Sequence, residues 1–277
     1  MKHITVILWI ILLSVNASAQ ELYVYTEPAS NMPARSVNGK LTTTLLKETA
    51  SNQSKQRHAP ELLYGISKKW MIHTAGTFSD MYSSNLRWES ARLYAKYRFL
   101  SLDEVHQHFR MAAFGEVSHS VNKAMYEEVS LNGDQSGVTG GVVLTQLWQR
   151  LALSSTLSYV KVTTQKPSVT PYSYPWQAFN YSLSAGYLLL PRAYTSNSFR
   201  QTNLNVYAEL LGQQTPDRKQ YYIDIAPAIQ LIFNSNAKLN LGHRLQLSGD
   251  MRRMAERSWQ LSFEYVFLNA LNKKSDQ

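Results

Sequence analysis

The sequence predicts an all-β protein: a closed, antiparallel transmembrane β-barrel of about 12 strands. Most of the chain alternates apolar residues with small or polar ones at a period of two, the spacing of side chains on the two faces of a strand. The second face is small and hydroxylated, as from Leu151 to Tyr159, whereas a water-exposed strand usually carries Lys, Glu and Arg. After the first fifteen residues no stretch has the pattern of a buried helix. A lipid-facing exterior around a polar interior accounts for these observations.

The expected strands follow this alternation in chain order, and their number is even, as in bacterial outer-membrane barrels. Most are close to the ~9 to 11 residues that a tilted strand needs to cross a bilayer. The expected ranges are 36–47, 59–66, 71–79, 86–100, 109–118, 138–148, 151–162, 179–190, 202–211, 221–233, 238–247 and 259–268.

The connections between these strands alternate in length. Those after odd-numbered strands are long and include residues 119–137 and 163–178, whereas those after even-numbered strands are short, residues 191–201 excepted. Outer-membrane barrels have short periplasmic turns and long extracellular loops. We therefore expect the N-terminus in the periplasm and the long loops outside the cell.

The N-terminus has the form of a signal peptide. Lys2 and His3 precede an apolar run from Ile4 to Val15, which is too short to span a bilayer as a helix, and the sequence Ala-Ser-Ala at 17–19 resembles a cleavage site. The expected organisation is a signal peptide at 1–19, a periplasmic strap or partial plug at 20–35, the barrel at 36–269 and a polar tail at 270–277. Export would place the protein in the cell outer membrane.

Composition narrows the partners. Lys and Arg number 28 against 19 Asp and Glu, a net charge of +9, but the basic residues are dispersed, so no nucleic-acid partner is expected. The absence of cysteine excludes disulfides and thiol chemistry. We expect a monomer whose partners are outer-membrane lipid and the barrel-assembly machinery, with no cofactor and no metal.

Charged residues on the second face of the strands are the candidate lumen lining. The basic ones gather on the fourth and fifth strands and three acidic ones on the ninth, tenth and twelfth, so that opposed walls would order charged solutes. In the alternative, they form structural pairs, such as Glu116 with Arg92 or Asp224 with Arg244, inside a closed lumen. The candidates are Arg92, Lys96, Arg98, His108, Arg110, Glu116, Glu209, Asp224, Arg244 and Glu264.

Three further local expectations follow from the strand pattern. Leu157 and Leu183 should face lipid near the middle of the membrane. Pro227 removes a ladder donor from its strand, which predicts a bulge there. The pattern of residues 138–148 does not decide which face points inward.

The last expected strand, residues 259–267, resembles the aromatic-ended signal that the assembly machinery recognises in outer-membrane barrels, although further residues follow it here. Across most of its length, including residues 21–33 and 221–230, the chain is similar to uncharacterised outer-membrane barrels of Bacteroidota. It is also loosely similar to outer-membrane transporters grouped with phenol-degradation pathways. The resemblance implies a fold and a location, and it supplies no catalytic residue and no substrate.

Two other chemistries have weaker support. Some twelve-stranded outer-membrane barrels are phospholipases, and His119 lies between Ser118 and Ser120, but neighbours on a strand point to opposite faces and cannot form a catalytic pair. A polar periplasmic turn explains another cluster without a metal ion: Asp103, Glu104, His106 and His108.

The expected function is passive passage or binding of a small polar solute in a narrow, charged lumen, without enzymatic activity. One alternative is a closed structural barrel whose outer loops at 119–137 and 163–178 meet a partner. A lipid hydrolase is the other alternative.

Overall fold

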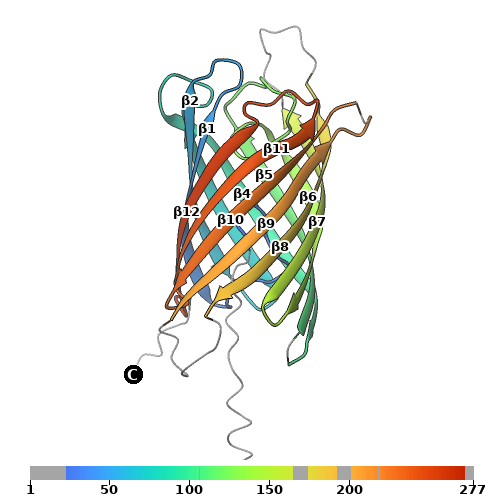
Figure 1. Cartoon of the computed structure of the whole chain (residues 1–277). Helices are drawn as coiled ribbons and strands as arrows, with labels where there is room; N and C mark the ends of the chain where they lie inside the picture. Colours follow the sequence, from blue (N-terminus) through green and yellow to red (C-terminus); the bar gives the residue numbers. More distant parts are fainter. Residues whose placement is uncertain (1–22, 106, 165–173, 192–200, 218, 272–277) are drawn as a thin grey trace, which may run out of the picture.

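The computed structural model, which describes residues 23–105, 107–164, 174–191, 201–217 and 219–271, is a closed antiparallel barrel (Figure 1). Each strand pairs with its neighbours in sequence, and β1 pairs with β12 to close the sheet. The strands are β1 (Ser36–Lys47), β2 (Ser54–Gly65), β3 (Trp70–Ser79), β4 (Arg87–Asp103), β5 (Gln107–Ser120), β6 (Ser136–Trp148), β7 (Leu151–Thr164), β8 (Gln177–Leu190), β9 (Thr202–Gln214), β10 (Tyr221–Phe233), β11 (Ala237–Gly249) and β12 (Arg257–Phe267).

The architecture confirms the predicted fold class, and the bounds of β1 and β10 are those expected. The main difference is β2, which begins at Ser54 rather than at residue 59 and pairs there with Lys47 of β1. The added residues are polar, so the sheet continues beyond the end of the apolar alternation. Among the described residues there is no helix long and apolar enough to cross a membrane.

Large apolar side chains cover the outside of the barrel. Leu157 is 56% exposed and Leu183 is 54% exposed, whereas their neighbours Thr156 and Ser182 line a cavity inside. These exposures agree with the faces expected for β7 and β8. An apolar exterior around a polar interior is the arrangement of membrane-spanning barrels.

The face that the sequence left undecided is that of β6. Val143 and Thr145 point into the barrel, where Val143 packs against Ala29 and Thr145 accepts a hydrogen bond from the Ala29 amide. Val138 and Val142 are exposed on the outside. The strand has valine on both faces because its inner face contacts another part of the chain, which hides the alternation.

The bulge expected at Pro227 does not form. Pro227 pairs with Ala208 of β9, and the register between β10 and β11 is the same before and after the proline. The register shift in this pair of strands lies instead between Ile223 and Asp224. Pro227 has no amide proton, so one ladder hydrogen bond is missing there, but no extra residue is inserted into the strand.

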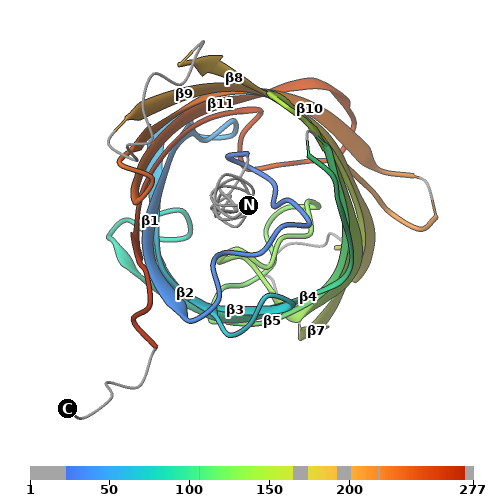
Figure 2. The same ribbon diagram turned by 90° about the horizontal axis from the view of Figure 1, so that it is seen from below.

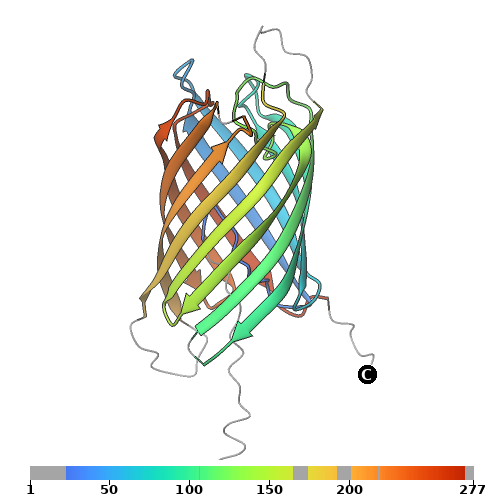
Figure 3. The ribbon, with the colours of Figure 1, turned by 90° about the vertical axis from the view of Figure 1, so that its right-hand side faces the viewer.

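Three segments of the described chain fold into the lumen or over its end. The segment at residues 23–35, which we call the strap, crosses the interior near the end where the chain enters, as the view from below shows (Figure 2). The connections at residues 121–135 and 250–256, which we call the outer loops, fold over the opposite end (Figure 3). The expected signal peptide and residues 272–277 of the expected tail lie outside the described residues.

Candidate functional site

The strap is anchored by one carboxylate. Glu209 of β9 is fully buried and accepts hydrogen bonds from the amides of Val24, Tyr25 and Thr26, at 2.9, 3.0 and 2.9 Å. The Thr26 hydroxyl donates a fourth, at 2.7 Å. Tyr23, at the start of the turn, has a φ of 74°. Consecutive amides that converge in this way form an anion-binding nest, here filled by a side chain of the barrel wall.

The next residues of the strap contact the opposite wall. Glu27 lies 3.0 Å from Lys96 Nζ on β4 and 3.3 Å from His73 Nδ1 on β3. The same ammonium donates to the Pro28 carbonyl at 2.8 Å. Lys96 is 1% exposed, so its charge is balanced by the strap and not by water.

Glycines in the wall leave room for the strap. A Cβ on Gly242 of β11 would lie 2.6 Å from the Tyr25 ring, and one on Gly65 of β2 would lie 2.1 Å from the Pro33 carbonyl oxygen. A Cβ at Gly65 would clash with backbone, whereas one at Gly242 would force the Tyr25 ring to move. The inner surface is therefore shaped to the path of the strap.

At the other end, the first outer loop turns inward instead of extending into solvent. Val129 and Leu131 are buried in a cluster with Val160, Val162 and Ala178 of the inner wall. The side-chain amide of Gln213 holds the Val129 backbone by two hydrogen bonds of 2.8 Å. The sequence predicts an extracellular loop at 119–137, and in the structure this stretch folds back into the end of the barrel because its apolar residues pack against the wall.

An ion-pair network attaches both outer loops to the wall. Arg253 donates to Glu128 at 2.9 Å and to Asp224 of β10 at 2.8 Å, and Arg244 of β11 contacts both carboxylates. Arg253 also lies over the Tyr222 ring, 3.9 Å from its centroid. Burial alone would raise the pKa of the Glu128 carboxyl, but the Arg253 and Arg244 guanidiniums lower it to about 2.

A second ion-pair group holds the rest of the first loop. Arg57 of β2 donates to Glu89 of β4 and to Asp134 of the loop. Arg57 is 8% exposed and Glu89 is fully buried. The charged contacts of the outer mouth are thus mostly shielded from water.

The sequence-predicted luminal charges pair locally. Arg92 lies between Glu61, at 3.4 Å, and Glu116, at 3.3 Å. Asp224 pairs with Arg244 and Arg253, and Lys96 with the strap. The opposed basic and acidic walls are therefore largely neutralised by neighbours.

The remaining candidates lie nearer the strap end of the barrel. Glu264 of β12 lies 3.9 Å from Lys40 and 3.4 Å from Lys238. His108 and Arg110 both contact Asp103, at 2.9 and 2.8 Å. Arg98 stands at a register shift in β4, where its amide donates to the Lys69 carbonyl.

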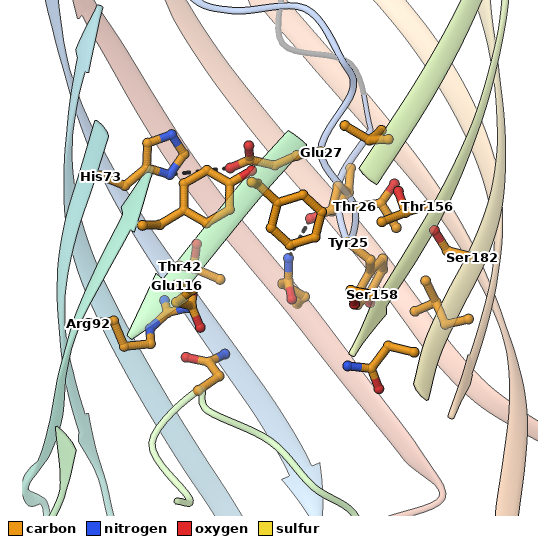
Figure 4. A pocket seen from close by; sticks show the side chains of 18 of the residues that line it. Tyr25, Thr26, Glu27, Thr42, His73, Arg92, Glu116, Thr156, Ser158 and Ser182 are labelled. Atoms are coloured by element: carbon orange, nitrogen blue, oxygen red, sulfur yellow. Dashed lines mark hydrogen bonds and ion pairs between the residues drawn. The ribbon is translucent and has the colours of Figure 1, made fainter. Parts of the chain in front are cut away.

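Between the strap and the first outer loop lies a cavity of about 410 Å³ (Figure 4). His73, Arg92 and Glu116 lie on one side of it, and Thr156, Ser158 and Ser182 lie on the other. A second cavity, of about 150 Å³, lies between this first cavity and the outer loops. The two cavities share four lining residues, so they adjoin along the barrel: Tyr25, Asn132, Arg244 and Gln260.

Sequence reasoning missed several residues of this site. Glu27 and Tyr25 come from the strap, and Asn132 comes from a loop expected outside. His73 lies on an expected strand, but only its contact with Glu27 marks it. The unusual glycines at inward positions are a signal that could have revealed the strap.

The described residues considered for lipid hydrolysis and for metal binding are not arranged as those chemistries require. Ser118 and Ser120 point inward and donate to the Leu131 and Gly133 carbonyls, whereas His119 between them is exposed. Within the part of the chain that the structure describes, no group of three or more His, Asp or Glu side chains is placed to hold a metal ion. His106, one of the histidines considered for such a site, lies outside that part.

Solved structures share this fold. An outer membrane channel from Pseudomonas putida F1 matches with a TM-score of 0.59 at 10% identity, over 88% of this chain and 100% of that one. The KdgM porin matches with a TM-score of 0.51 at 7% identity, over 83% and 99%. The NanC porin matches with a TM-score of 0.50 at 10% identity, over 83% and 98%. At these identities the likeness shows the fold alone. No protein-family model and no curated protein matches the sequence.

Proposed function

We propose that this protein is an outer-membrane channel of the porin type, whose lumen admits and passes small polar solutes. The observation that carries the proposal is a cavity of about 410 Å³, lined by polar and aromatic side chains, inside a barrel with an apolar exterior. The similar solved structures include proteins named as porins and as an outer membrane channel, which supports the same class.

The paired charges bear on how solutes would pass. Each guanidinium of the cavity, Arg92 and Arg244, already contacts two carboxylates. A pore with compensated charges selects ions weakly, because selectivity requires an uncompensated ring of one sign. The strap and the outer loops narrow the lumen, so steric restriction limits passage more than charge does.

Conductance in planar bilayers tests this function. We expect the full chain to give small, weakly selective conductance steps in KCl. Gly242→Val should change the size of the step, because a side chain there displaces the Tyr25 ring, which lines the cavity. Gly39→Val is the matched control, since a Cβ on Gly39 meets no atom within 4 Å and should leave the step unchanged.

One observation favours a second candidate, a closed structural barrel. The strap and the outer loops cross the lumen at its two ends, and most of the luminal charges contact a partner. If neither the wild-type chain nor Gly242→Val conducts, the closed barrel is the better account and the channel proposal fails.

A further inference from the structure

We infer that the mid-lumen cavity is a binding site for an uncharged, polyhydroxylated solute of monosaccharide to disaccharide size. The inference deepens the proposed function, because the solute must enter the lumen to reach the site. It rests on three features of the lining: its two unlike walls, its unpartnered polar atoms and its compensated charges.

The two walls of the cavity differ in chemistry. One presents short neutral groups from β7 and β8, namely Thr156, Ser158 and Ser182. The other presents the rings of Tyr94 and Phe114, stacked with their centroids 5.6 Å apart. A sugar ring has the matching character, since its C–H faces pack on aromatic rings while its hydroxyls exchange hydrogen bonds with hydroxyl side chains.

Three buried polar atoms on residues that line the cavity have no hydrogen-bond partner within the described residues. They are Tyr25 Oη, Ser182 Oγ and Arg92 Nε. Buried polar groups are normally paired, so a small rotation of each side chain toward the cavity would let its unpaired atom bond a guest. Together they offer donors and acceptors from the strap and from two walls, as a polyol requires.

The charges around the cavity argue against an ionic guest. Arg92 is shared by Glu61 and Glu116, Glu27 contacts Lys96, and Lys40 contacts Glu264. A charged solute would have to displace one of these contacts and leave a partner unpaired in a poorly hydrated site, which is costly. A neutral solute meets no such cost.

Size and access are consistent with this class. A volume of about 410 Å³ lies within the ~300 to 1,000 Å³ of typical small-molecule sites. The adjoining cavity extends this space toward the outer loops, which is the route by which we expect a solute to reach the site.

The experiment measures block of the KCl current through the full chain by maltose. Gluconate and lysine serve as charged solutes, which are smaller than maltose and can enter any site that admits it. Calorimetry with maltose on the detergent-solubilised protein measures binding independently of conductance. We expect saturable block and binding by maltose, with gluconate and lysine about tenfold weaker or more.

Two variants locate the site. Ser182→Ala should weaken maltose binding about 2- to 10-fold by removing one hydrogen bond, without loss of folding because Ser182 Oγ has no partner among the described residues. Phe114→Ala should weaken it by a similar factor. The matched controls are Ser155→Ala and Phe179→Ala, which alter exposed residues on the outer face and should bind as wild type.

Each outcome decides one or both proposals. Conductance without maltose binding, or with equal block by gluconate or lysine, would overturn the inferred site and leave the channel standing. Maltose binding without conductance would overturn the channel and leave the site standing. Binding that Ser182→Ala and Phe114→Ala do not change would place the sugar elsewhere and reject the inference. The absence of both signals rejects both proposals.

Discussion

The strap and the outer loops both occupy the lumen, but different interactions hold them there. The strap is held through backbone amides on Glu209 and by close packing against Gly65 and Gly242. The outer loops are held largely by ion pairs, centred on Arg253 and Arg57. Close packing against glycine does not depend on pH, whereas the contacts of Glu209 and Glu27 at the strap and the ion pairs of the outer loops depend on the protonation of carboxylates. Because different carboxylates and different packing hold the two ends of the lumen, we expect the ends to open under different conditions.

The largest expected effect is at the strap. Glu209→Ala leaves the amides of Val24, Tyr25 and Thr26 without an acceptor, at ~1 to 3 kcal/mol for each buried donor. If the free energy that holds the strap in place falls by ~3 kcal/mol, the amides of residues 24–26 should exchange about 100-fold faster. Hydrogen exchange read by mass spectrometry measures this, and conductance should rise in parallel.

The control for this variant lies within the same molecule. The amide of Val129 in the first outer loop, which donates to Gln213 of β9, should exchange as in the wild type. Faster exchange at both ends would show that the strap and the loops open together and are not held independently.

A smaller effect is expected at the outer loops. Loss of one partner from a buried ion pair costs ~3 to 5 kcal/mol, but Arg244 still contacts Glu128 and Asp224 in Arg253→Ala, so we expect ~1 to 3 kcal/mol. Exchange of the Val129 amide should quicken about 10- to 100-fold. Exchange in residues 24–26 should stay unchanged, and equal protection of Val129 in the variant would contradict the role given to Arg253.

The smallest expected effect is acid opening of the outer mouth. The pKa of Glu128 is lowered from 4.5 to about 2, so its ion pairs stabilise the closed loops above pH 4.5 and are lost as the pH falls toward 2. Conductance should therefore increase between pH 4.5 and 2. In Glu128→Gln the larger conductance should already be present at pH 7, and an unaltered acid step in this variant would assign the transition to another group.

The strands could be predicted because their signal is local. Alternation at period two gave the bounds of β1 and β10 and put Leu157 and Thr156 on opposite faces. The prediction failed where the apolar outer surface ends. Residues 54–58 of β2 lie beyond that surface, so the hydrogen-bonded sheet continues there without a hydrophobic pattern.

The site could be predicted only in part. The period places Glu209 on the luminal face, but its partners are backbone amides, which have no residue signature. Charge counting suggested opposed walls because it ignored the strap, whose Glu27 neutralises Lys96. Val129 and Leu131 are apolar residues in a loop, and that was the available sign that the loop folds inward.

The strap also links two distant strands across the lumen. Its first amides bind Glu209 of β9 and its last residue precedes Ser36 of β1, so a fixed length of chain connects the two strands. An extended chain reaches at most ~3.3 to 3.6 Å per residue, and the diameter of a barrel grows with its number of strands. An added hairpin would widen the ring and carry Glu209 away from Val24 unless the strap grew as well. The length of this segment and the number of strands are therefore coupled, and the strap sets an upper limit on the circumference of the barrel that closes around it.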